Sequence, residues 1–349
     1  MKIAFFTYPS AFQNIGGGEI LLLKLRQYLQ KEGVMVDLFD IWNGKIEEYE
    51  ILHVFGSVKD CLGLVEVANA RNVKVAITPL FWSDFRRALF TEGSVRTKTE
   101  FLARHLTKVI WPSFPSARRK LLVRSDLIFP NSIIEQKQIA RFFSIPQAKM
   151  KVVANGVDPE FAQADPFLFF KNYGQEPFIL GVGRIEPRKN QLNLIRAVKK
   201  IGNKRLVMIG SPVSGHESYF KKCQEEGKGF TLFMPTIKHE DALLRSAYAA
   251  CELFVLQGWF ETPGLAAMEA ALAGARVVAT CGGSTREYFL GTIDYLDPSN
   301  VSDIRQVIAK NLNTAKNDRL KNHILQNFTW DKIAKSTCAH YKSLLGQPR

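Results

Sequence analysis

Short apolar runs alternate with amphipathic stretches along the chain. KIAFFTY at 2–8 has the length of a buried strand, and GGEILLLKLRQYLQKEG at 17–33 places apolar residues at helical spacing before a stop at Gly33. This alternation continues to about residue 158 and restarts with FILGVGRI at 178–185. Repeated pairing of strand and helix predicts an α/β protein with parallel sheets.

The same pattern predicts the remaining elements. In the first half we expect strands at 35–41, 51–56, 74–80, 126–132 and 151–158, and a helix at 133–145. In the second half we expect helices at 190–201, 215–227, 239–250, 264–274, 303–313 and 328–345, and strands at 205–211, 230–236, 251–257 and 275–280.

The two series predict two domains. We expect a doubly wound, Rossmann-like domain at 1–165, a second at 166–329, and a closing helix at 330–349 anchored by Trp330. Two such domains would face a central cleft, and ligands bind beyond the carboxyl ends of parallel strands. We therefore look for chemistry in the residues that follow each strand.

Composition is that of a soluble globular protein, with 46% hydrophobic and 23% charged residues. Apolar runs are shorter than the 18 or more residues typical of a transmembrane helix, and the N-terminal run is too short for a signal sequence. The 5 cysteines are scattered without a CxxC pair, which favours reduced thiols over disulfides or a zinc site. We expect a cytoplasmic protein.

The formal net charge of +14 is concentrated in one stretch, 86–124. Its cations are Arg86, Arg87, Arg96, Lys98, Arg104, Lys108, Arg118, Arg119, Lys120 and Arg124, against Glu92 and Glu100. This excess suits an anionic membrane surface, a phosphorylated substrate or nucleic acid, or it is a solvated face without a partner. Interspersed aromatic residues such as Trp111 and Phe114 favour peripheral binding to the inner membrane face.

Two glycine-containing turns follow predicted strands. Gly16, Gly17 and Gly18 precede Glu19 at the start of a predicted helix, where exposed amides suit an anion or a substrate hydroxyl, although such a turn can also be purely structural. The other turn, GVGRIEPRKN at 181–190, contains Gly183 but has Glu186 where a dinucleotide fingerprint needs its third glycine.

Arg184 and Lys189 in this second turn could neutralise a diphosphate. Arginine offers a bidentate fork and lysine a mobile point charge. Both follow the strand closely, and Pro187 restricts the turn between them. The alternative is that these are ordinary loop charges in water.

Two glutamates flank the turn between the predicted strand at 251–257 and the helix at 264–274. Glu261 lies beside the helix start, where the amides of Gly264 and Leu265 suit phosphate oxygens. Glu269 interrupts the apolar run LAAMEAALA and needs polar partners if it is buried. The vicinal hydroxyls of a ribose would serve, and so would a structural arginine.

These motifs resemble a known enzyme family. FETPGLAAMEAALAGARVVATCGG at 260–283 is similar to the E-x7-E signature of retaining glycosyltransferases of family 4, which have the GT-B fold. IGGGE at 15–19, VVANGVD at 152–158, the turn at 181–190 and the closing helix resemble other segments of that family in the same order. The resemblance covers nearly the full length.

The resemblance implies a role for each residue. Arg184 and Lys189, with Gly183 in the same loop, would bind the donor diphosphate; Glu261 would hold the donor sugar, and Glu269 the ribose. Amides near Gly264 and Leu265 would contact the phosphates, while the loop 16–19 would line the donor–acceptor site. The implied substrates are a nucleotide-diphosphate sugar and a hydroxyl of a glycan, lipid-linked or small-molecule acceptor. No cofactor or metal ion is implied, and the sequence has no D-x-D motif.

One feature departs from the family. Many relatives carry a histidine after the strand that here ends near Pro79, and this chain has none between His53 and His105. Trp82, Ser83 or Asp84 could face the same space. A nucleotide-sugar epimerase on the same fold and a non-enzymatic nucleic-acid-binding module are the alternatives, although no nucleic-acid motif is present.

Overall fold

The computed structural model describes residues 1–13, 15–83, 95–315 and 318–346, which form two compact units. The first unit takes its described residues from 1–83, 95–156 and 328–346, and the second from 157–315 and 318–327. The division after Gly156 precedes the expected boundary at 165/166. The buried ring of Phe161 accounts for this, because it packs against His239 and Tyr248 of the second unit, with ring centroids 5.5 and 5.8 Å away.

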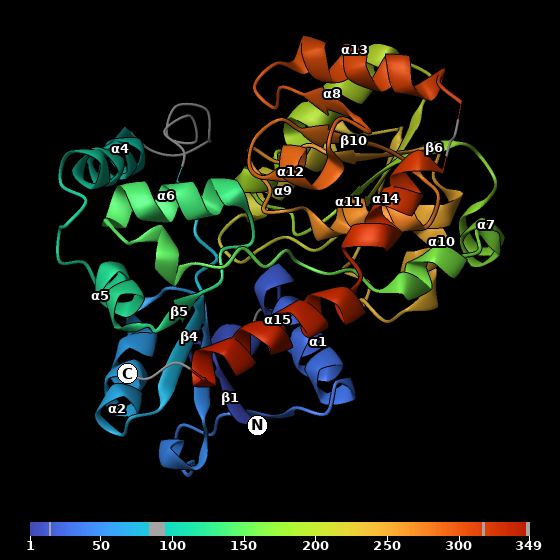
Figure 1. Ribbon diagram of the computed structural model, residues 1–349. Helices are drawn as coiled ribbons and strands as arrows, with labels where there is room; N and C mark the ends of the chain where they lie inside the picture. The colour runs from blue at the N-terminus through green and yellow to red at the C-terminus, as the bar shows by residue number, and fades with distance from the viewer. Residues whose placement is uncertain (14, 84–94, 316–317, 347–349) are drawn as a thin grey trace. The chain divides into compact units, whose positions relative to one another are not determined.

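The first unit contains a five-stranded parallel sheet in the order β2-β1-β3-β4-β5 (Figure 1). This is the flavodoxin-like doubly wound order. Its strands are β1 (Lys2–Phe6), β2 (Met35–Leu38), β3 (Ile51–Phe55), β4 (Lys74–Thr78) and β5 (Leu127–Ile128). Its helices are α1 (Gly17–Lys31), α2 (Leu62–Ala70), α4 (Val95–Ile110), α5 (Ala117–Arg124), α6 (Ile133–Phe143) and α15 (Trp330–Leu345).

The second unit contains a six-stranded parallel sheet in the order β11-β10-β9-β6-β7-β8, which is the classic Rossmann order. Its strands are β6 (Phe178–Val182), β7 (Arg205–Ile209), β8 (Thr231–Met234), β9 (Leu253–Leu256), β10 (Arg276–Thr280) and β11 (Asp294–Leu296). Its helices are α7 (Phe167–Tyr173), α8 (Gln191–Ile201), α9 (Glu217–Glu226), α10 (Ala242–Ala250), α11 (Leu265–Leu272), α12 (Thr285–Phe289), α13 (Val301–Leu312) and α14 (Arg319–Asn327).

Each sheet has one switch point, the place where the chain reverses the direction in which it adds strands. It lies between β1 and β3 in the first unit, and between β6 and β9 in the second. Ligands of doubly wound sheets bind at this point, beyond the carboxyl ends of the strands. The expected α/β class with two parallel-sheet, Rossmann-like domains is thereby confirmed.

The expected strand at 151–158 is not formed. Its neighbour β5 has only two residues, and Met150 makes an isolated parallel bridge to Ile128. Further on, Lys151 N–H donates to the Ile128 carbonyl and Val153 N–H to the Pro130 carbonyl, both at 2.9 Å. The segment therefore runs extended beside β5 without becoming a sixth strand.

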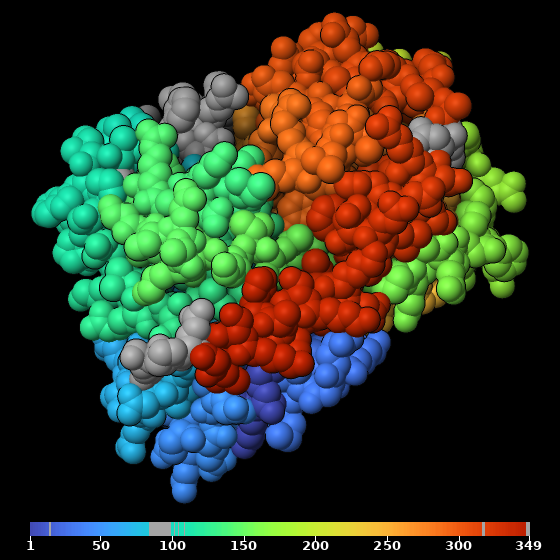
Figure 2. All heavy atoms as spheres, in the orientation of Figure 1, coloured from blue at the N-terminus to red at the C-terminus, as the bar shows by residue number. Residues whose placement is uncertain are grey.

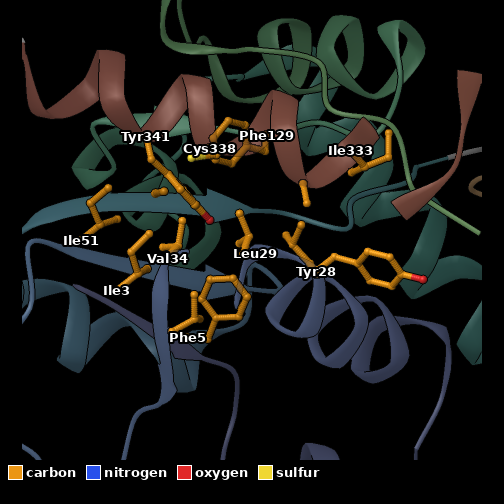
Figure 3. Close-up of a cluster of buried hydrophobic side chains, with 14 of the residues drawn as sticks. Ile3, Phe5, Tyr28, Leu29, Val34, Ile51, Phe129, Ile333, Cys338 and Tyr341 are labelled. Carbon is orange, nitrogen blue, oxygen red and sulfur yellow. The ribbon is translucent and has the colours of Figure 1, made fainter. Parts of the chain in front are cut away.

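The closing helix α15 packs on α1 of the first unit (Figures 1 and 2). Figure 3 shows its inner face, including Ile333, Cys338 and Tyr341, over the sheet residues Ile3 and Phe5. Trp330 at its start is 2% exposed, and a Cβ atom at Gly156 would lie 2.5 Å from its ring. The Asn-Gly turn therefore needs glycine to admit the tryptophan.

A buried histidine links α15 to the centre of the sheet. His53 of β3 contacts the hydroxyl of Tyr341 through Nδ1, and its Nε2 lies 2.9 Å from Thr78 Oγ1. Burial lowers the pKa of His53 to about 3, so this histidine is neutral at pH 7. His53 therefore has a structural role in the core of the first unit.

Candidate functional site

The loop after β6 brings two cations close to one carboxylate. Gly183 has a φ of +148°, which L side chains rarely adopt, and the chain then turns into Pro187–Lys189. Glu186 accepts from Arg188 at 3.1 Å and lies 3.7 Å from Arg184. The Arg184 side chain is 43% exposed, so it remains available to a ligand beside the switch point.

Lys189 and Glu261 meet in a tight ion pair at the switch point of the second unit. Lys189 Nζ lies 2.7 Å from Oε1 and 3.0 Å from Oε2 of Glu261. Their side chains are only 19% and 7% exposed. Burial lowers the pKa of the Lys189 ammonium, and the Glu261 carboxylate opposes that shift. Two residues that the sequence placed after different strands, β6 and β9, are thus in direct contact.

The backbone around Glu261 is fixed by three glycines. A Cβ atom at Gly258 would lie 2.5 Å from Glu261 Oε1, and one at Gly283 would lie 2.0 Å from the Glu261 carbonyl. At Gly282 a Cβ atom would lie 2.3 Å from the Trp259 carbonyl. Glu261 N–H donates to the Gly282 carbonyl, and Ser284 N–H donates to the Glu261 carbonyl. The Gly-Gly pair after β10 therefore lets that loop hold the glutamate by main-chain bonds.

Polar side chains tie the two loops together. Asn190 begins α8 with a φ of +57°, and its amide donates to the carbonyls of Gln257 and Pro298 at 3.2 and 2.8 Å. Gln257 in turn donates to the Lys189 carbonyl at 3.0 Å. Their buried amides hold the lysine loop against the glutamate loop, and neither residue was predicted from the sequence.

The start of α11 lies beside Glu261. Gly264 has a φ of +98°. A side chain would not fit at this position, because its Cβ atom would lie 2.4 Å from Leu256 Cδ2 and 3.6 Å from Glu261 Cβ. The helix begins at Leu265 without a side-chain cap. A helix start of this kind presents main-chain N–H groups that lack intrahelical acceptors.

Glu269 is buried on α11 among partners that were not predicted from the sequence. Its Oε2 accepts from the Tyr248 hydroxyl at 2.8 Å, and its Oε1 lies 3.0 Å from His239 Nε2. His239 Nδ1 also lies 4.0 Å from Asp158 Oδ2. Within the protein the carboxylate is held by a tyrosine and a histidine rather than by an arginine, and the expected contact with a ribose stays a prediction. In the sequence, the only hint of this role was that the hydroxyl of Tyr248 falls within the mostly apolar second half of α10.

The glycine loop of the first unit caps α1. Glu19 Oε2 accepts from Gly16 N–H at 2.7 Å, which closes the helix start, and its Oε1 lies 3.4 Å from the Tyr8 hydroxyl. Gly17 is the first residue of α1, and a Cβ atom at Gly18 would lie 3.2 Å from Leu80 Cδ1. Glu19 therefore has a structural role in this loop.

The segment after β4 turns inward. Trp82 is partly buried, whereas Ser83 is 5% exposed and its Oγ lies 3.0 Å from His105 Nδ1. Both main-chain groups of Ser83 bond to the Gln138 amide, at 2.9 and 3.1 Å. Ser83 is thus committed to α4 and α6, and Asp84 lies outside the described residues.

The basic stretch 86–124 is only partly described. Residues 86–94 lie outside the described residues, as do several side chains of α4. Lys120 is exposed, Arg124 lies 3.3 Å from Glu66, and Arg119 donates to the Phe143 carbonyl at 3.1 Å. Some of these cations therefore stabilise the first unit itself. None of the described helices is both long and apolar enough to cross a bilayer.

Comparison with known proteins agrees with this architecture. Residues 167–326 match the family model Glycosyl transferases group 1. Over 264 residues the chain is 29% identical to a D-inositol 3-phosphate glycosyltransferase of Nocardioides, covering 65% of this chain and 57% of that protein. An uncharacterized glycosyltransferase of Methanocaldococcus jannaschii is 28% identical over 231 residues, covering 59% and 57%. The chain thus spans little more than half the length of these curated relatives.

Solved structures are similar over nearly the whole chain. Anabaena HepE in complex with UDP aligns with a TM-score of 0.73 and 16% identity, covering 98% of this chain and 100% of that chain. Sucrose-phosphate synthase of Thermosynechococcus elongatus aligns with a TM-score of 0.78 and 16% identity, covering 99% of each. At this identity the similarity concerns the fold. Residues 167–326, which include Lys189, Glu261 and Glu269, thus match this family model, and the whole chain has the GT-B fold of these structures.

Proposed function

We propose that this protein is a retaining glycosyltransferase that moves a sugar from a nucleotide-diphosphate sugar to an acceptor hydroxyl. The observation that carries the proposal is the Lys189–Glu261 pair at the switch point of the second unit, inside the segment that matches the family model. Among the similar structures, HepE was solved in complex with UDP and also in complex with UDP-glucose. UDP-sugars are therefore the first donors to test.

The second unit would bind the donor. Arg184 and Lys189 would face the diphosphate, and the N–H groups at Gly264 and Leu265 would bind its oxygens. Glu261 keeps Lys189 charged and could accept from sugar hydroxyls with its remaining lone pairs. Glu269 uses one lone pair on each oxygen for Tyr248 and His239, which leaves room for ribose hydroxyls.

The reaction would depend on electrostatic stabilisation. The bond from the anomeric carbon to the diphosphate breaks while the acceptor oxygen bonds to the same face of that carbon, which retains its configuration. The acceptor proton passes to an oxygen of the leaving phosphate. Lys189 and Arg184 stabilise the negative charge that develops there, so we propose that transfer needs no divalent cation.

A donor assay with and without acceptor tests this proposal. Purified protein is incubated with UDP-, GDP- and ADP-sugars, with candidate hydroxyl acceptors added or omitted, and products are identified by mass spectrometry and NMR. We expect an α-linked product from an α-linked donor, unaffected by EDTA. A changed sugar without acceptor would indicate an epimerase, and binding to RNA or DNA without any nucleotide-sugar binding would contradict an enzyme of this class.

We propose in addition that the acceptor is lipid-linked and that α4 lies on an anionic membrane. The exposed apolar residues Leu102, Leu106, Val109 and Ile110 recur at helical spacing on one face of α4. Trp111 and Phe114, which follow the end of α4, are 57% and 44% exposed. Apolar and aromatic side chains within a basic stretch favour binding to anionic lipid headgroups.

Liposome sedimentation tests the membrane proposal. At low salt we expect the protein to sediment with phosphatidylglycerol vesicles and to remain in solution with phosphatidylcholine vesicles. Trp111→Ser should weaken binding, whereas Trp42→Ser should not, although Trp42 is 90% exposed on the same unit. A wild-type protein that stays in the supernatant with anionic vesicles would contradict the proposal.

A further inference from the structure

Arg118 lies beyond the carboxyl ends of β3 and β4 in the first unit. Its Nε donates to the carbonyl of Ser57, at 3.1 Å, and to the Ser57 hydroxyl, at 2.9 Å. Ser57 follows β3 and is itself fixed by a bond from its hydroxyl to the Pro79 carbonyl. The guanidinium also lies over the Phe81 ring, 5.2 Å from its centroid. The side chain is therefore held by residues that follow β3 and β4.

The charge of Arg118 lacks a counter-ion among the described residues of its unit. Within those residues, no carboxylate pairs with Arg118 and no acceptor bonds to its Nη1 or Nη2. Burial lowers the pKa of the guanidinium, although it remains protonated at pH 7. By contrast, Arg124 on the same helix pairs with Glu66. A partly buried cation without a counter-ion is costly unless an anion binds it.

The turn after β4, on which Arg118 stacks, also contacts the glycine loop. Phe81, on which the guanidinium stacks, follows Leu80, and Leu80 Cδ1 would lie 3.2 Å from a Cβ atom at Gly18. The glycine loop, the turn after β3 and the turn after β4 therefore meet beyond the carboxyl ends of the strands. The guanidinium of Arg118 lies at this end of the sheet, which is the end where doubly wound sheets bind their ligands.

We propose that the Nη1 and Nη2 groups of Arg118 bind a phosphate group carried by the acceptor. The inference rests on the proposed function, because it assigns the acceptor to this unit and gives it a chemical class. A planar fork of N–H donors matches two oxygens of a phosphate. The formal charge of +14 favours a dianion over a carboxylate. The phosphate is either a soluble ester or a lipid headgroup.

The direct test is NMR of the Arg118 Nε–Hε resonance during titration with inorganic phosphate. The protein is first saturated with UDP, so that phosphate does not report on the donor site. The resonance is assigned by its loss in Arg118→Gln, and wild-type protein supplies the binding curve. We expect phosphate to shift this resonance, and acetate at equal ionic strength to shift it much less.

Calorimetry on variants supplies the affinity. Arg118→Gln should weaken phosphate binding roughly tenfold or more, because it removes a charged bidentate partner, and Arg118→Lys should fall between. Arg124→Gln is the matched control and should bind like wild type. Vesicles containing phosphatidic acid distinguish the source: a shift with vesicles assigns a lipid headgroup, and a shift with inorganic phosphate alone assigns a soluble ester.

The failure of this inference is distinguishable from failure of the proposed function. An Arg118 resonance unmoved by phosphate and by vesicles overturns the phosphate subsite, even if UDP binds. Acetate binding as tightly as phosphate would overturn the assignment to phosphate. Failure to bind any nucleotide would instead contradict the donor site, and the phosphate titration would then be evaluated on the nucleotide-free protein.

Discussion

Each unit has a cation beyond the carboxyl ends of its strands, and the two cations lie in opposite electrostatic settings. In the second unit Lys189 is largely buried and contacts both oxygens of Glu261. In the first unit Arg118 is partly buried and bonds only to Ser57 among the described residues, without a carboxylate. In both units the doubly wound fold places the cation beyond the carboxyl ends of the strands.

The two cations therefore suit two different tasks. A lysine already paired with a carboxylate is held in place before the donor arrives, and little has to reorganise as charge develops on the diphosphate. An arginine without a counter-ion gains most from a ligand that brings the missing negative charge. We therefore assign transition-state stabilisation to the second unit and recognition of an anionic acceptor to the first.

The largest expected effect is on transfer. Lys189→Ala and Glu261→Ala should each lower kcat by about 10²-fold or more, since one removes the cation and the other leaves it without its partner. Steady-state assays with a UDP-sugar measure this. Lys199→Ala on α8, where the lysine is 57% exposed and pairs with Glu226, is the matched control. Near-wild-type turnover in both site variants would refute the site.

The same pair should be strongly coupled in stability. Lys189→Met and Glu261→Gln should each cost about 3–5 kcal/mol of unfolding free energy, because each leaves a buried polar partner uncompensated. The double variant should cost clearly less than the sum of the two. Urea unfolding of the four proteins measures the coupling, and additive costs would show that the contact contributes nothing.

A pH effect should arise from Glu135 in the first unit. Burial raises the pKa of Glu135, which accepts from Phe81 and Asn131 N–H, from 4.5 to about 7. Its stabilising contribution is then fully present below pH 4.5 and is lost as the pH rises through 7. Relative to Glu135→Gln, wild type should lose about 3 kcal/mol between pH 4 and pH 8. A constant difference in urea unfolding across that range would contradict the assignment.

A smaller effect should follow at Glu269. Tyr248→Phe removes the hydroxyl that donates to Oε2, and the unfolding free energy should fall by about 1–3 kcal/mol. Tyr173→Phe on α7 is the control, because its hydroxyl has no hydrogen-bond partner among the described residues. Equal stability of the two variants would mean that the carboxylate does not depend on Tyr248.

The smallest effect should be at Arg118. Arg118→Met removes the bonds to Ser57 but also removes a desolvated charge without a counter-ion, so stability should change by no more than about 1 kcal/mol. A loss of 3 kcal/mol or more of unfolding free energy would show that the protein stabilises the charge of Arg118 as strongly as Glu261 stabilises that of Lys189. That result would remove the contrast between the two units.

Much of the fold could be predicted from the sequence. Buried runs such as 178–182 are apolar throughout, as parallel strands require, and α8 shows its apolar face at helical spacing. Helices α2, α4, α5, α7, α12 and α14 and strand β11 were not predicted. The predicted strand at 151–158 failed because a two-residue β5 offers too few partners, a property of the neighbour that the segment itself does not reveal.

The candidate site was only partly predictable. Arg184, Lys189 and Glu261 were identified because they follow strands, and position after a strand is visible in the sequence. Tyr248 and His239 come from other elements, and only packing brings them to Glu269. Arg118 was visible as one cation among many, but the lack of a carboxylate beside it among the described residues is a property of the folded unit.

Binding of UDP to wild type and to Lys189→Ala tests most directly whether Lys189 belongs to a diphosphate site. Thermal and urea unfolding are followed with UDP at about 100 times its dissociation constant for wild type, where one bound ligand adds about 2.7 kcal/mol. We predict that wild type gains this stability and that Lys189→Ala gains little of it, while Lys199→Ala behaves as wild type. Equal stabilisation of all three proteins, or of none, would contradict a diphosphate site at Lys189.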